Sequence, residues 1–85
     1  LAGNCFGDYY TRGGLDTRRR EMITLCFLAA QGGCEPQLTS HAVANMRVGN
    51  DERFLIAVIS QCTPYIGYPR TLNALRCIAD AAAKA

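Results

Sequence analysis

The 85-residue sequence lacks tryptophan, has a single histidine and contains no long apolar run. A membrane span needs about 18 apolar residues, whereas the longest run here, residues 22–30, is interrupted by Thr24. No basic stretch precedes an apolar one, so we predict no signal peptide, and because the chain begins at Leu1 we expect a longer gene product. With 49% hydrophobic and 19% charged residues the chain is too apolar for disorder. We therefore predict one soluble, cytoplasmic domain over residues 1–85, truncated at its N-terminus, with no membrane partner.

The sequence also has little excess of positive over negative charge, since the net charge is +2 and the pI is near 8.4. Domains that bind nucleic acid generally have a pI above about 9 and a clustered basic face. The one basic cluster, Arg18-Arg19-Arg20, is followed at once by Glu21. This pattern is typical of a solvated first turn of a helix, and we predict no nucleic-acid partner.

The five cysteines form no Cys-x-x-Cys pair, which excludes zinc ribbons and fingers. With only one histidine and no paired acidic neighbours, we predict no metal site. Cys26, Cys62 and Cys77 stand at apolar helical positions, where a free cysteine behaves as a small buried hydrophobe. Cys5 lies in an N-terminal segment that gives no interpretable pattern.

Valine and isoleucine recur at helical spacing and do not alternate as in strands, so we predict an all-α fold. Asp16 is a plausible N-cap for a first helix over residues 17–31, which Gly32 and the glycine after it would end. Pro36 fits the first turn of a second helix, which would run until Gly49.

Two further helices complete the prediction. Asn50 or Asp51 would cap the third helix, and Pro64, Gly67 and Pro69 would break or kink it. Pro69 would then open the fourth helix. The apolar stripe expected on this fourth helix consists of Leu72, Leu75 and Ala79.

The first and third helices are apolar nearly all round, and the glycine-rich residues 1–16 are expected to form a loop. A helix with apolar residues on every side must be covered on more than one side. A domain this small buries only about 60% of its unfolded-chain surface by itself. We therefore predict a homo-oligomer whose neighbouring chains cover the excess apolar surface.

Glu21 is the first residue that could carry chemistry. In the first helix it shares a face with Leu25 and Leu28, so its carboxylate would point toward apolar surroundings. A carboxyl in such a place either pairs with a cation or is suited to act as a general acid or base. The alternative is a surface glutamate near the helix start, where negative charge is favourable.

His41 lies on an apolar stripe of the second helix with Leu38 and Val48. Imidazole is the side chain best suited to proton transfer near neutral pH, so His41 is a candidate general acid or base. The alternative is a core histidine bonded to a carbonyl. Cys34 stands just before this helix, whose positive end would favour a thiolate and make it the most reactive of the thiols. Its alternative role is a small residue tolerated at a turn, and no oxyanion-hole pattern supports acyl transfer.

Four segments appear in a characteristic order. They are Arg20-Glu21 opening an apolar helix, His41 in the next helix, residues 49–52 (GNDE), and residues 65–69 (YIGYP). Together they resemble the carboxymuconolactone decarboxylase family, which includes the alkylhydroperoxidase D-like proteins. The resemblance covers about residues 6–80.

The resemblance implies an all-α fold assembled as homotrimers or homohexamers, with the active site between helices and often between subunits. One branch of that family decarboxylates a carboxylated lactone without metal or organic cofactor, and the resemblance assigns its catalytic positions to Glu21 and His41, with Cys34 lining the pocket. The other branch reduces peroxides through a Cys-x-x-Cys pair, but here Gln37 replaces the second cysteine. A disulfide relay needs two thiols within reach of each other. We therefore expect a cofactor-independent carboxy-lyase acting on a small molecule.

Two alternatives stay open. One is a thiol peroxidase in which Cys34 is attacked, and the other is a non-catalytic oligomeric binding protein that kept the fold. Decarboxylation of a carboxylate substrate also requires positively charged side chains that bind the substrate. The candidate substrate-binding residues are Arg20, Arg47, Arg70 and, in the shared Tyr-x-Gly-x-Pro segment, Tyr65.

Overall fold

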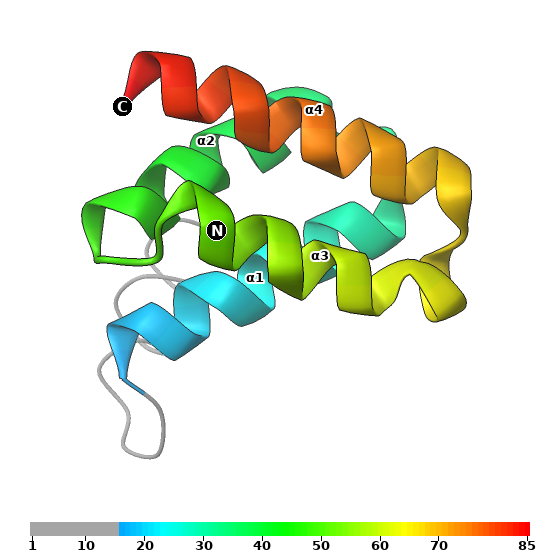
Figure 1. Ribbon diagram of the computed structural model, residues 1–85, viewed down its shortest axis with the longest axis horizontal. Helices are drawn as coiled ribbons and strands as arrows, with labels where there is room; N and C mark the ends of the chain where they lie inside the picture. Colours follow the sequence, from blue (N-terminus) through cyan, green and yellow to red (C-terminus); the bar gives the residue numbers. More distant parts are fainter. Residues whose placement is uncertain (1–15) are drawn as a thin grey trace.

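Four helices follow one another in the computed structural model, which describes residues 16–85 (Figure 1). They are α1 (Thr17–Gln31), α2 (Glu35–Arg47), α3 (Glu52–Ile66) and α4 (Tyr68–Lys84). No strand occurs in this part of the chain, so the all-α prediction is confirmed. Except for Asp16, the predicted N-terminal loop, together with Cys5, lies outside the described residues.

The predicted caps fix both ends of α1 and α3. An Asp16 carboxylate oxygen accepts a hydrogen bond from the Arg19 backbone N–H at 2.9 Å, and Asp51 does the same for the Phe54 N–H at 2.8 Å. Both helices end at glycines with positive φ, 73° at Gly32 and 84° at Gly67. These φ values lie outside the right-handed helical region, so both helices end there. Residues other than glycine rarely adopt them.

Replacing Asp51 with alanine should lower the free energy of unfolding by about 1 kcal/mol, because the Phe54 N–H loses its acceptor. Urea denaturation followed by circular dichroism would measure the change. Asp80→Ala is the matched control, because this exposed aspartate lies inside α4 and caps nothing. An equal effect of the two substitutions would contradict the capping role.

Of the three residues predicted to break or kink the third helix, Pro64 does not break it. Helix α3 continues through Pro64 to Ile66, and the break comes at Gly67. A proline inside a helix removes the hydrogen bond to the carbonyl four residues earlier, here that of Ser60. Ser60 is exposed, so water can replace the missing donor and the last turn survives.

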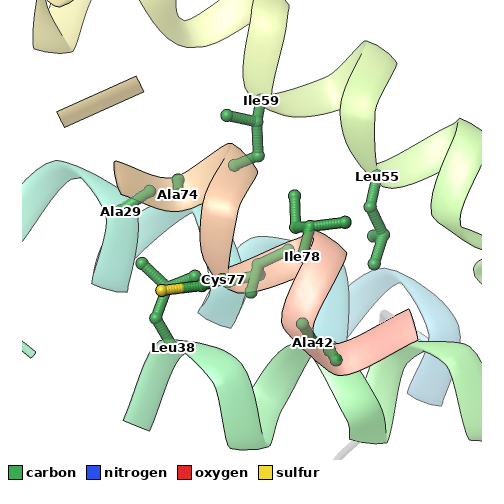
Figure 2. Close-up of a cluster of buried hydrophobic side chains, with 10 residues drawn as sticks. Ala29, Leu38, Ala42, Leu55, Ile59, Ala74, Cys77 and Ile78 are labelled. Atoms are coloured by element: carbon green, nitrogen blue, oxygen red, sulfur yellow. The ribbon is translucent and has the colours of Figure 1, made fainter. Parts of the chain in front are cut away.

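Successive helices run in opposite directions, so each of α1 to α3 is antiparallel to the helix that follows it (Figure 1). Helix α4 packs most extensively against α2 and α3, and α1 packs mainly against α2. The side chains between the helices form one buried cluster: Leu25, Ala29, Leu38, Ala42, Leu55, Ile59, Ala74, Cys77, Ile78 and Ala81. Figure 2 shows Leu55 and Ile59 of α3 pointing toward α4, and the Cys77 sulfur beside Leu38.

The stripe predicted for the fourth helix is correct only for Leu75, which is partly buried against the core. Leu72 is 57% exposed and Ala79 is exposed, whereas the buried face of α4 consists of Thr71, Ala74, Cys77, Ile78 and Ala81. The alanines on this face let α4 lie close to α2 and α3. Small side chains at a helix contact shorten the distance between helix axes, which offsets their small individual burial. The size of the side chains, and not their hydrophobicity alone, therefore determines which face of α4 is buried.

Large apolar side chains remain on the surface of the described chain: Phe27, Phe54, Ile56, Tyr65, Tyr68 and Leu72. Phe27 and the two tyrosines are each more than 70% exposed. Exposed apolar area of this kind often marks an interaction surface. The predicted homo-oligomer would cover such residues, and its stoichiometry stays a prediction.

Candidate functional site

Glu21 and His41 meet where α1 and α2 cross. His41 Nδ1 lies 3.2 Å from Glu21 Oε1, and the glutamate side chain is only 4% exposed. The helical spacing predicted that Glu21 faces inward, and it does. The His41 side chain is 21% exposed, so part of the ring reaches the surface. The arrangement joins a buried carboxylate to one nitrogen of an accessible imidazole, which is how a carboxylate orients a histidine for proton transfer.

Asn45 holds the two helices together beneath this pair. Its side-chain amide donates to the Glu21 carbonyl at 3.0 Å and to the His41 carbonyl at 2.8 Å. Asn45 is fully buried. One side chain therefore fixes the backbone at both members of the pair, which limits their relative movement.

Asn50 extends this polar network toward the start of α1. Its amide donates to Asn45 Oδ1 at 2.9 Å and to the Arg18 carbonyl at 2.8 Å, while Arg18 Nε donates to Asn50 Oδ1 at 3.3 Å. From the sequence, Asn50 was expected only as a helix cap, and no role was expected for Asn45. The role of Asn45 could have been inferred from its position, four residues after His41 on a buried stripe, because a buried amide requires hydrogen-bond partners.

Cys34 lies away from the Glu21–His41 pair. Its thiol donates to the Leu28 carbonyl at 3.3 Å, and Leu28 is seven residues beyond Glu21 in α1. Cys34 likewise precedes His41 by seven residues. At 1.5 Å per residue this separation is about 10 Å along each helix. The sequence did not predict whether the three residues converge; along the helix axes, the fold places Cys34 about two turns from the pair.

The four predicted substrate-binding residues are spread over the molecule. Arg20 adjoins Glu21 and has one fully buried guanidinium nitrogen, and Arg47 lies in the last turn of α2. Arg70 packs over Gly32, where an added Cβ would stand 2.7 Å from Arg70 Nε. Gly32 is eleven residues beyond Glu21, about 16 Å along α1. Tyr65 is 88% exposed near the end of α3.

A surface hollow of about 250 Å³ opens at the start of α1. It combines two arginines with apolar and polar side chains, and its lining consists of Asp16, Arg18, Arg19, Met22, Asn50 and Phe54. Neither Glu21 nor His41 lines it, but Arg18 and Met22 flank the turn that carries Glu21. The hollow therefore places two arginines, Arg18 and Arg19, beside the first turn of α1.

Within residues 16–85 no three histidine, cysteine or acidic side chains come together in a way that could hold a metal ion. None of the helices described over that range is long and apolar enough to cross a membrane.

Over residues 16–85, the fold and the site define a bundle of four helices in which a buried carboxylate of α1 contacts a partly exposed imidazole of α2. The chain belongs to the carboxymuconolactone decarboxylase family, which it matches over residues 1–80. A comparison with curated proteins finds no match. The resemblance drawn from the sequence is therefore confirmed at the level of the family.

Proposed function

We propose that this protein is a cofactor-independent decarboxylase of a small carboxylated lactone, with Glu21 and His41 as its proton-transfer pair. The observation that carries the proposal is the 3.2 Å contact between a buried carboxylate and a partly exposed imidazole. Family membership alone is compatible with both branches, so the proposal rests on the chemistry of the site.

The reaction itself determines what the protein must supply. When the carbon–carbon bond to the carboxylate breaks, carbon dioxide leaves and the electron pair passes into the unsaturated lactone carbonyl. The resulting enolate carbon then takes up one proton, so each turnover consumes one. The lactone carbonyl is the electron sink, and an organic cofactor is not required for that step.

In this mechanism His41 donates the proton from Nε2, the ring nitrogen opposite the one beside Glu21. Glu21 fixes the ring through Nδ1 and stabilises the imidazolium form that precedes donation. General acid catalysis of this kind contributes about 10²–10⁴-fold to a rate. The His41 side chain is partly exposed, and the mechanism requires that this exposure include Nε2.

Arg20 is the best placed of the four predicted substrate-binding residues. It adjoins Glu21, and an arginine can bind a carboxylate with two parallel hydrogen bonds. Tyr65 and Arg70 lie on either side of Gly67, where α3 ends and α4 begins. Arg70 contacts Gly32, which is about 16 Å along α1 from Glu21, so a small substrate could not reach both Arg70 and Arg20 in the same chain. In a homotrimer or homohexamer, a neighbouring chain would have to present them.

Thiol peroxidase activity is the competing proposal, because Cys34 caps the N-terminus of α2, where the helix dipole favours a thiolate. However, the peroxidase branch uses a second cysteine to resolve the oxidised one, and this chain has Gln37 at that position. The absence of that cysteine therefore favours the decarboxylase proposal.

A Cys34→Ser variant separates the two activities. We expect it to keep lactone decarboxylation within about threefold of the wild type, since its sulfur lies two helical turns from the pair. Carbon dioxide release would measure the lactone reaction, and consumption of hydrogen peroxide and an organic hydroperoxide would be followed on the same samples. Peroxide turnover by the wild type that disappears in Cys34→Ser would overturn the decarboxylase proposal.

A further inference from the structure

Two cysteines outside the Glu21–His41 site face each other across α1 and α3. Cys62 Sγ lies 3.9 Å from Cys26 Sγ, and both residues are partly buried. The Cys62 thiol also donates to the Val58 carbonyl, four residues earlier in α3, at 3.5 Å. The other described cysteines bond to backbone carbonyls as well, Cys34 to that of Leu28 and Cys77 to that of Glu35. Among residues 16–85, Cys26 and Cys62 are thus the pair whose sulfurs are in direct contact.

We propose that Cys26 and Cys62 form a redox-active dithiol that closes reversibly to an intrachain disulfide joining α1 to α3, with a low-molecular-weight disulfide as the oxidant. This site is independent of the proposed decarboxylation. A disulfide bond is about 2.05 Å long, so the two sulfurs need to approach by roughly 1.9 Å. Side-chain rotation together with a small helix displacement can supply such a movement.

The environment of the pair determines which thiol reacts first. Burial, and then the neighbouring Cys62 sulfur, raise the pKa of the Cys26 thiol to about 12. A raised pKa makes the Cys26 thiol a poor first nucleophile, so in this proposal the first attack falls to Cys62. The thiolate is the attacking species in disulfide exchange.

Two exchange steps complete the oxidation. The Cys62 thiolate attacks one sulfur of the external disulfide, forms a mixed disulfide and expels one external thiolate. Cys26 then loses its proton, attacks the Cys62 sulfur of the mixed disulfide and expels the second external thiolate. The two protein thiols give up two electrons and two protons, and the external disulfide is reduced to two thiols.

The disulfide would raise the thermal stability of the protein. The two cysteines are 36 residues apart in sequence, so the bond would close a long loop that includes the whole of α2. Closing a loop restricts the unfolded chain and stabilises the folded one. For a domain of this size we expect the oxidised form to melt about 10 °C above the reduced form.

The experiment uses the whole chain, reduced, then equilibrated with mixtures of reduced and oxidised glutathione and alkylated with N-ethylmaleimide. Digestion with trypsin and chymotrypsin is required, because trypsin alone leaves Cys26 and Cys34 in one peptide, whereas cleavage after Phe27 separates them. Mass spectrometry should identify a peptide containing Cys26 joined to one containing Cys62, and dithiothreitol should release both.

Cys34→Ser is the matched control and should keep both the cross-link and the rise in Tm on oxidation. Cys26→Ser and Cys62→Ser should lose both. The mapping in the wild-type protein does not depend on whether these variants fold. Absence of the Cys26–Cys62 link across the whole range of mixtures, or a link through Cys34, Cys77 or a second chain in its place, would overturn the proposal.

Discussion

Replacing His41 with glutamine is expected to lower kcat for lactone decarboxylation by about 10²–10⁴-fold. Glutamine keeps a polar group of similar reach beside Glu21 but has no proton to deliver near neutral pH. The partial exposure of His41 means that the substitution leaves no large cavity, so the fold should persist. Carbon dioxide release at saturating substrate, with circular dichroism of the same sample, would check both parts.

Ser40→Ala is the control for this prediction, because Ser40 is the exposed neighbour of His41 on α2. It should leave kcat unchanged. If His41→Gln retains wild-type turnover while remaining folded, His41 is not the proton donor and the proposed mechanism is wrong.

Glu21→Gln tests the positioning role of the carboxylate. The amide fills the same volume and keeps a hydrogen-bonding atom near His41 Nδ1, but it cannot stabilise an imidazolium by charge. We expect kcat to fall while KM changes little, because the carboxylate acts on His41 and not on the substrate. A change in KM alone would instead indicate that Glu21 contacts the substrate.

The helix ends could be predicted because they depend on local chemistry. Asp16 and Asp51 cap through hydrogen bonds to residues three positions later, and Gly32 and Gly67 end helices through their own backbone conformation. Such signals need no knowledge of the tertiary structure. Pro64 misled because its effect on a helix depends on whether solvent reaches the carbonyl it leaves unbonded, which is a tertiary property.

The site could be predicted only in part, for the same reason. Helical periodicity correctly oriented Glu21 inward, since Leu25 on the same face belongs to the core. The contact with His41, by contrast, depends on where α1 and α2 cross. The same crossing separates Cys34 from the pair, although the sequence places it between Glu21 and His41. Order along the chain therefore could not give the distances between the candidate residues.

Asn45→Ala should lower the free energy of unfolding by about 2–4 kcal/mol, because it removes hydrogen bonds to the Glu21 and His41 carbonyls and to the Asn50 amide. This is a large share of the stability of a small domain, which is typically about 5–15 kcal/mol. Urea denaturation would measure the loss, and Asn73→Ala provides the same substitution at an exposed position of α4. A loss no greater than that of Asn73→Ala would show that the packing of the helices, and not Asn45, holds α1 against α2. If Asn45 does hold them, the folded fraction of Asn45→Ala should also decarboxylate more slowly, since the backbone at both Glu21 and His41 loses its common anchor.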